Sequence, residues 1–521
     1  MAVTGPVRRQ WRPAAIVAAA LALGVVLVTA ARDTGARDTG GATPDSEARF
    51  VLPSRPGAAA PSASQAGTPP RASSTVWSDP ATVGQPYGTK VQGLLTFRGN
   101  PTRTYYGTGP APRTTPDEFW RFPGSGGLCS ESEDQSGVRV WCGSGWTGQP
   151  AVFERGGRTW VVFGAYDRAI HFLDAQTGAR ILPDFPTGDI IKGSVTVDPD
   201  GYPLVYSGSR DNYYRVIAID RGRPTELWRL SAKAVSPTMW NDDWDGSGLV
   251  IDDYLFMGGE NGQFHIVKLN RSYAADGRVR VAPKLVFNAP GWDAQLLRDI
   301  GDQNVSIENS VAIHGNTVYF ANSGGLVQGW DISGLEEGRK PTRVFRFWTG
   351  DDTDASIVID EAGMLYVGVE YERGTARSKA VGQIIKLDPS RPGNPLVWKV
   401  DDRGNLPAGV WGTPALYQDI AIFDTTGGDV LGIDRATGAV RWRFHLPGNE
   451  TWQSPVVIDG VLLIGDCLGY LHAYDVTNTA APPTPLWTLK VGGCIESTPA
   501  VWKGRMYFGT RAGAIHALGL R

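Results

Sequence analysis

Acidic and aromatic residues gather in the short connections of this chain, where their types could bind a cation or a ligand. Ca²⁺ prefers carboxylate oxygens, and an indole ring offers a flat face to a sugar or an apolar group. The candidate ligand-binding residues are Trp244, Trp292, Glu308, Asn309, Asp354, Trp411, Trp452 and Glu496. The candidate calcium ligands are Asp243, Asp245, Asp352 and Asp354. Residues 241–248 match a calcium loop only in part, and Asp and Gly are also ordinary turn formers.

These residues must be positioned by a repeated β-structure. Residues 412–444 contain four short runs rich in β-branched and aromatic residues, which predicts an antiparallel meander. The unit recurs along the chain, and each copy has an Asp at the end of its third strand: Asp174, Asp220, Asp331, Asp388, Asp434 and Asp475, with Asn270 in the third place. Their spacing fits propeller blades of about 40–50 residues with inserted loops.

The ring is expected to close with a strand from the N-terminal side. The last repeat supplies three strands, and residues 119–122 match the missing outer strand. The sequence therefore predicts an all-β fold, an eight-bladed propeller of four-stranded antiparallel blades without exposed sheet edges. Antiparallel order places the blade-to-blade connections and the turns between second and third strands on one face, the top face. All of the candidate residues map to that face.

The chain has four cysteines, an even number that favours disulfides in an exported protein. Cys129 and Cys142 lie in one loop before the first blade. Cys467 and Cys494 reach the top face on neighbouring blades. We predict the bonds Cys129–Cys142 and Cys467–Cys494. The histidines at 171, 265, 472 and 516 belong to different blades, so we expect them to pack or to form hydrogen bonds within blades rather than to bind a metal.

Residues 432–442, GIDRATGAVRW, resemble the tryptophan-docking motif of quinoprotein-type propellers. They keep Asp434, Thr437, Gly438 and Trp442 and depart from the motif at Gly432 and Ala439. Looser copies at Leu173 and Ala218 extend the likeness, so the chain resembles the PQQ-like repeat propellers of the quinoprotein alcohol dehydrogenase-like superfamily. For an enzyme of that group the resemblance implies PQQ, calcium and an adjacent cysteine pair. No adjacent pair is present, so we favour a non-catalytic member and do not expect PQQ.

The N-terminal region divides into three segments before the propeller of residues 77–521. Residues 1–13 form a basic tail, and residues 14–31 form an uncharged apolar run of about 27 Å as a helix, which is close to the thickness of a bilayer core. Residues 32–76 are rich in Ala, Pro, Gly and Ser and predict a disordered linker. We favour a retained transmembrane anchor with the propeller outside the cytoplasm, and a cleaved signal peptide followed by secretion is the alternative.

A net charge of −3 without a basic stripe argues against nucleic-acid binding. We expect a monomeric binding or scaffold module of the bacterial envelope, which meets its ligand or partner on the top face. The non-catalytic relatives implied by the resemblance favour an envelope protein as partner. The mixture of Trp and Asp also suits a glycan, and a PQQ- and calcium-dependent dehydrogenase is a further alternative. Calcium is the cofactor that the residues themselves suggest.

Overall fold

The computed structural model describes residues 76–134, 137–145, 148–404, 408–448 and 450–521. The predicted basic tail, the apolar segment and all but the last residue of the linker lie outside the described residues. None of the helices in the described part of the chain is long and apolar enough to cross a membrane.

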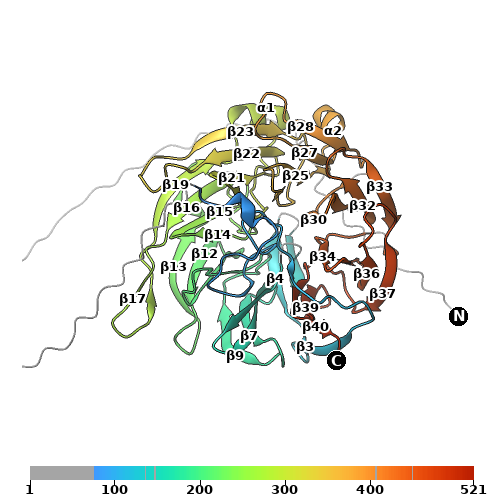
Figure 1. Ribbon diagram of the computed structural model, residues 1–521. Helices are drawn as coiled ribbons and strands as arrows, with labels where there is room; N and C mark the ends of the chain where they lie inside the picture. The colour runs from blue at the N-terminus through green and yellow to red at the C-terminus, as the bar shows by residue number, and fades with distance from the viewer. Residues whose placement is uncertain (1–75, 135–136, 146–147, 405–407, 449) are drawn as a thin grey trace, which may run out of the picture. The chain divides into compact units, whose positions relative to one another are not determined.

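Eight blades, each with four antiparallel strands, form a ring (Figure 1), and the sheets of two blades carry a fifth strand from the N-terminal segment. Blade 1 contains β6 (Ala151–Arg155), β7 (Arg158–Ala165), β8 (Ala169–Asp174) and β9 (Arg180–Pro186), and blade 2 contains β10 (Thr196–Val197), β11 (Leu204–Ser207), β12 (Tyr213–Ala218) and β13 (Thr225–Ser231). Blade 3 contains β14 (Leu249–Ile251), β15 (Tyr254–Gly258), β16 (Gln263–Lys268) and β19 (Lys284–Pro290), and blade 4 contains β20 (Ala312–His314), β21 (Thr317–Phe320), β22 (Leu326–Asp331) and β23 (Thr342–Trp348).

Blade 5 contains β24 (Val358–Ile359), β25 (Leu365–Gly368), β27 (Ile384–Leu387) and β28 (Leu396–Val400), and blade 6 contains β30 (Ala415–Tyr417), β31 (Ile420–Asp424), β32 (Asp429–Asp434) and β33 (Val440–His445). Blade 7 contains β34 (Val456–Ile458), β35 (Val461–Gly465), β36 (Tyr470–Asp475) and β37 (Thr484–Lys490). Blade 8 combines β38 (Ala500–Trp502), β39 (Arg505–Thr510) and β40 (Ala514–Gly519) with β3 (Asp117–Phe122). The antiparallel pairing of β3 with β40 confirms the predicted closure of the ring.

The remaining elements decorate the blades. They are η1 (Pro80–Thr82), η2 (Ala232–Ala234), the helices α1 (Ala294–Ile300) and α2 (Ala376–Val381), and the strand pairs β4 (Cys129–Asp134) with β5 (Gly137–Cys142), β17 (Ser272–Tyr273) with β18 (Val279–Arg280), and β26 (Glu370–Tyr371) with β29 (Ala408–Gly409). Helix α1 lies in the connection between β19 and β20. It begins at Asp293, whose carboxylate accepts the Leu296 amide, and ends at Gly301 in the left-handed conformation.

Outer-strand tryptophans join neighbouring blades. The Trp442 ring covers Gly432, where an added Cβ would lie 2.0 Å from the indole, so the departure from the usual motif at Gly432 has a steric reason. Each of four indole nitrogens donates a hydrogen bond to a carbonyl of the next blade or of the segment leading into it: Trp398 to Arg435, Trp442 to Thr479, Trp487 to Pro112 and Trp120 to Ala175. These tryptophans therefore connect their outer strands to the neighbouring part of the ring.

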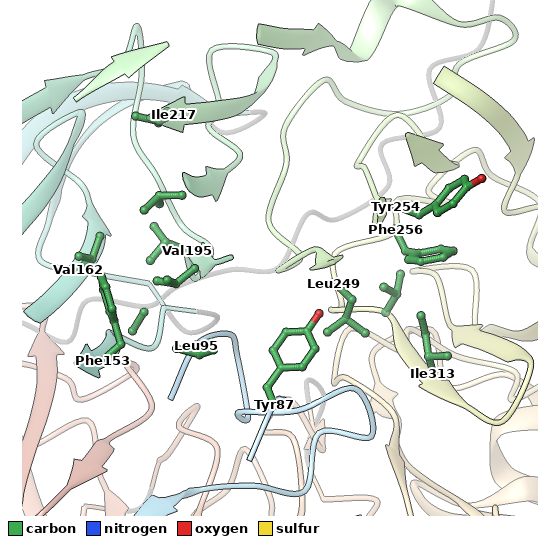
Figure 2. Packing of buried hydrophobic residues seen from close by; sticks show 14 of the residues in the cluster. Tyr87, Leu95, Phe153, Val162, Val195, Ile217, Leu249, Tyr254, Phe256 and Ile313 are labelled. Atoms are coloured by element: carbon green, nitrogen blue, oxygen red, sulfur yellow. The ribbon is translucent and has the colours of Figure 1, made fainter. Parts of the chain in front are cut away.

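Residues 93–108 run through the middle of the ring and touch the inner edge of every blade. Strand β1 (Gly93–Leu94) pairs with β6 of blade 1, and β2 (Gly107–Thr108) lies parallel to β38 of blade 8. Between them, the backbone of the segment bonds to blades 2, 4 and 5, through Leu95, Pro101 and Thr102. The inner residues of blades 1–4 form one apolar cluster, in which Figure 2 shows Tyr87 and Leu95 of the N-terminal segment beside Leu249 and Val195.

Two arginines of this segment complete the contacts. Arg98 donates hydrogen bonds to the carbonyls of Pro414 in blade 6 and Pro455 in blade 7. Arg103 donates to the carbonyls of Ser247 and Val311, which lie just before the inner strands of blades 3 and 4. Both side chains are fully buried. The segment therefore occupies the centre of the ring and links the inner edges of the blades.

Candidate functional site

One backbone hydrogen bond repeats in every blade and defines equivalent positions at the top of the channel. In each bond an amide after the second strand donates to a carbonyl in the preceding blade connection, as from Glu260 to Asp243 at 2.9 Å and from Glu370 to Asp352 at 2.8 Å. The residue two places after each acceptor forms what we call the mouth ring. Its members, from blade 1 to blade 8, are Gly145, Lys192, Asp245, Glu308, Asp354, Trp411, Trp452 and Glu496.

Neighbouring members of the mouth ring approach one another across blade boundaries. The Lys192 ammonium lies 2.5 Å from Asp245, and the rings of Trp411 and Trp452 are 4.2 Å apart. The structure thus brings together five of the eight candidate ligand-binding residues, namely Glu308, Asp354, Trp411, Trp452 and Glu496. The ring has an acidic arc over blades 3–5 and an aromatic pair over blades 6 and 7.

Trp244 lies one residue away from the mouth ring, and its side chain points into the core. It is 1% exposed and packs on Tyr214 and His265, with ring centroids 5.6 and 5.1 Å away. Side chains alternate in an extended connection, so the neighbour of a channel-facing residue enters the space between blades. We therefore leave Trp244 out of the candidate site.

Trp292 and Asn309 also serve the scaffold. Trp292 is 8% exposed and packs with Leu296 of α1, so the long loop covers an apolar group beside blade 4. The Asn309 amide group donates to the carbonyls of Ala321 and Thr353, and its oxygen accepts the Ala321 amide. Both side chains therefore make structural contacts within the blades and the long loop.

The first acidic triad, Asp243, Asp245 and Glu260, surrounds a lysine. Lys192 lies 2.8 Å from Glu260 and 3.7 Å from Asp243, in addition to its contact with Asp245. Arg210 donates to Asp243 at 2.6 Å. Burial alone would lower the pKa of Lys192, but the surrounding carboxylates hold that pKa well above its usual range. The ammonium thus occupies the place that a calcium ion at Asp243 and Asp245 would need.

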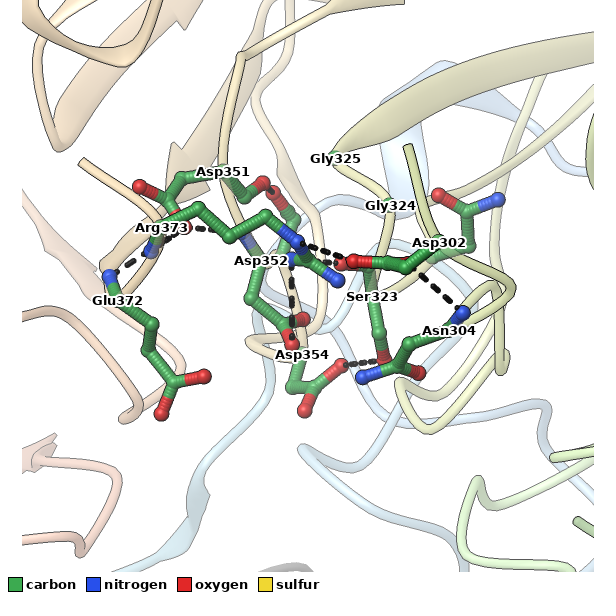
Figure 3. Close-up of polar contacts among 12 residues, drawn as sticks. Asp302, Asn304, Ser323, Gly324, Gly325, Asp351, Asp352, Asp354, Glu372 and Arg373 are labelled. Atoms are coloured by element: carbon green, nitrogen blue, oxygen red, sulfur yellow. Dashed lines mark hydrogen bonds and ion pairs between the residues drawn. The ribbon is translucent and has the colours of Figure 1, made fainter. Parts of the chain in front are cut away.

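The second acidic triad, Asp352, Asp354 and Glu370, contains no such lysine. Carboxylate oxygens of the three residues lie within 4.8 Å of one another. Figure 3 shows Arg373 reaching from the neighbourhood of Asp352 toward Asp302, and the serine at 323 beside Asp354. Burial, and then repulsion between the carboxylates, raises the pKa of Asp354 and of Glu370 well above the usual range. This triad is the strongest candidate for a cation site.

The predicted disulfides are both present. Cys129 and Cys142 face each other across β4 and β5 and fasten that hairpin. Cys467 and Cys494 connect blades 7 and 8 beside the mouth ring. Next to them, Glu496 lies 3.6 Å from Arg511, and Leu468 is 55% exposed.

The histidines have local partners, as predicted. His472 contacts Asp466 and Thr488 of its own blade, and His516 contacts Glu118 of the closing strand. His265 is buried beside Trp244. Neither of the two candidate metal-binding groups among the described residues includes a histidine.

Asp424 is a buried carboxyl at the end of β31, close to Gly412, where an added Cβ would lie 2.6 Å from the Asp424 Oδ1 atom. It is 1% exposed, and neither carboxylate oxygen hydrogen bonds to another residue in the described part of the chain. Burial raises the pKa of Asp424 to about 8. The group is therefore mostly neutral in the folded protein at neutral pH.

We expect Asp424→Asn to stabilise the protein, and to do so more at high pH. The unfolded chain ionises Asp424 near pH 4, so the wild type loses stability as the pH rises from about 4 to about 8, whereas asparagine loses none. The expected gain is about 1–2 kcal/mol at about pH 5 and about 4–5 kcal/mol at about pH 8. Denaturant unfolding of both proteins at the two pH values measures it. Equal or lower stability of the variant at about pH 8 would contradict the assignment.

Glu308, Asn309 and Asp354 match the ligands of a PQQ–calcium centre by residue type and face but by no enzyme motif, and they do not fit that centre. The Asn309 amide is committed to three backbone groups. Below the mouth, the channel is filled by the segment that carries Arg98 and Arg103.

The repeated blades, their docked tryptophans and the ring closure define a PQQ-like repeat β-propeller. A family model described as outer membrane protein assembly factor BamB matches residues 214–521, which is more than half of the chain. The chain belongs to that family.

Similarity to individual proteins is distant. The serine/threonine-protein kinase AfsK of Streptomyces griseus is 28% identical over 169 residues, and the match covers 31% of this chain and only 19% of the kinase. The computationally designed Ika8 protein shares 15% identity at a TM-score of 0.50, over 72% of this chain and 99% of its own. BamB from Moraxella catarrhalis is 13% identical, over 78% of this chain and 98% of its own, with a TM-score of 0.36. Identities this low indicate at most a shared fold.

Proposed function

We propose that this protein is a non-catalytic binding or scaffold propeller whose partner contacts the mouth ring. The proposal rests on one contrast: the blades repeat the same strand pattern, whereas the residue type at the mouth-ring position differs from blade to blade. Blade walls are built from equivalent residues, whereas the mouth ring changes from lysine through carboxylates to tryptophans. Because residues 93–108 fill the centre of the ring, a ligand would contact the mouth ring and would not enter the channel.

The side chains of the mouth ring favour a protein partner with basic and apolar side chains. Carboxylates of the acidic arc would attract a basic group, and the half-buried Trp411 and Trp452 offer an aromatic surface of the kind that anchors interfaces. Exposed Leu468 extends that apolar surface on blade 7. The family description, an outer membrane protein assembly factor, supports a protein partner in the cell envelope.

The proposed location is outside the cytoplasm, tethered to the membrane. Two disulfides and no free cysteine are found among the described residues, which suits an oxidising compartment. The apolar run at residues 14–31 would supply the anchor.

The double variant Trp411→Ala/Trp452→Ala should lose the partner while keeping the fold. Removing two adjacent aromatic anchors from an interface costs about 2–4 kcal/mol, or roughly 30- to 1000-fold in affinity. The measurement is recovery of a stoichiometric protein from envelope extract by the wild type and the variant.

A matched control replaces two exposed side chains away from the mouth ring, Tyr273 in β17 and Val344 in β23, by alanine. The control should recover the partner as the wild type does. Loss with the control alone, or undiminished recovery with the tryptophan variant, would place the interface elsewhere.

A further inference from the structure

The two acidic triads occupy equivalent places in blades 3 and 5. Asp243 and Asp352 each accept the repeated backbone bond, Asp245 and Asp354 each stand in the mouth ring, and Glu260 and Glu370 each donate the repeated bond. The local sequences agree as well, with DDWDGS at residues 242–247 and DDTDAS at residues 351–356. The triads can therefore be compared residue by residue.

The difference between them lies in the preceding blade. Blade 2 supplies Lys192 and Arg210 to the first triad. At the equivalent positions blade 4 supplies Glu308 and a serine, Ser323. Two cations are thus replaced by a fourth carboxylate and a hydroxyl group, so the second triad has gained negative charge where the first is neutralised.

The protein offers the second triad little compensation. Arg373 approaches Asp352 only to 3.9 Å and lies closer, at 3.2 Å, to Asp302. Asp352 is 5% exposed, and its Oδ1 atom has no hydrogen-bond partner among the described residues. The Glu370 side chain is 2% exposed and held in position by the pairing of β26 with β29. The Ser323 hydroxyl donates to Asp354, but the buried Oδ1 atom of Asp352 is left unpaired, which is costly and which an ion of opposite charge would relieve.

We propose that Asp352, Asp354 and Glu370 bind a divalent cation of the Ca²⁺ class at the top of blade 5. Ligand oxygens at about 2.3–2.6 Å from Ca²⁺ lie at most about 5 Å from each other. The carboxylate oxygens of the triad, which all lie within 4.8 Å of one another, satisfy this limit. An all-oxygen set without thiolate or imidazole disfavours zinc. Glu308 lies in the neighbouring position of the mouth ring and adds negative charge beside the ion. The inference stands independently of the proposed partner.

Isothermal titration of the chelated, full-length protein with CaCl₂ tests the site. We expect binding of one Ca²⁺ per chain and a higher melting temperature that a chelator reverses. The double variant Asp352→Asn/Glu370→Gln should lose both effects. It should also melt higher than the wild type when no calcium is present, because two buried charges are removed, so a folded and stable variant is the expected material.

Asp242→Asn is the matched control, since Asp242 is the counterpart of Asp351 in the first triad's connection and pairs only with exposed Lys233. The control should bind Ca²⁺ like the wild type. Absence of heat and of a melting shift for the folded wild type at millimolar Ca²⁺ would overturn the proposal. So would undiminished binding by the double variant. A titration with Mg²⁺ that gives tighter binding than Ca²⁺ would overturn the assignment to the Ca²⁺ class.

Discussion

Replacing Arg103 with methionine should destabilise the propeller by about 3–5 kcal/mol. The guanidinium is fully buried and donates to the carbonyls of Phe97, Ser247 and Val311. Methionine fills part of the volume but leaves these buried acceptors without donors. Lysine should not rescue the loss, because a single ammonium cannot reproduce the planar fork that spans blades 3 and 4. Denaturant unfolding monitored by tryptophan fluorescence measures the effect.

Arg278→Met is a suitable control, because Arg278 is exposed and forms a surface ion pair with Asp276. Its effect should stay within about 0.5 kcal/mol. A loss for Arg103→Met that is no larger than this control's would show that the central segment does not hold the blades together.

Lys192→Met is the second substitution with a large expected effect. Removing the ammonium leaves Asp243, Asp245 and Glu260 buried beside one another, and breaking a buried ion network in this way costs about 3–5 kcal/mol. Burial, and then repulsion by Glu260, already raises the pKa of Asp243. Without Lys192 the carboxylates must take up protons to stay buried, so the loss of stability should grow as the pH rises. Unfolding free energies at about pH 5 and about pH 8 measure this dependence.

The control for that substitution is Lys233→Met, which removes an exposed ammonium 2.9 Å from Asp242. Surface pairs contribute about 0–1 kcal/mol, so this variant should resemble the wild type at both pH values. A pH-independent loss for Lys192→Met would mean that the lysine acts through packing and not through its charge.

The repeat pattern predicted the fold well because each blade is a local unit with its own strands and turns. Residues 119–122 could be assigned to blade 8 from their likeness to other outer strands, and the structure pairs them there. The docking of Trp442 was predictable from the motif that ends in that residue. In both cases the information lies within one repeat.

The candidate site was less predictable because its residues come from separate parts of each blade. Glu260 and Glu370 follow the second strand, and only the repeated backbone bond brings them to the aspartates of the preceding connection. The alternation of side chains would have separated Trp244 from Asp245. The role of Arg103 depends on blades 3 and 4 far along the chain, and no local pattern reveals it.

Contact between a partner and the mouth ring is tested most directly by photo-crosslinking in cells that make the full chain. The photo-crosslinking residue replaces Trp452 or Glu496 in the mouth ring, or Val344 on an outer strand. If a partner contacts the mouth ring, both mouth positions cross-link to one and the same protein and position 344 does not. Cross-links from position 344 with none from the mouth would contradict such contact.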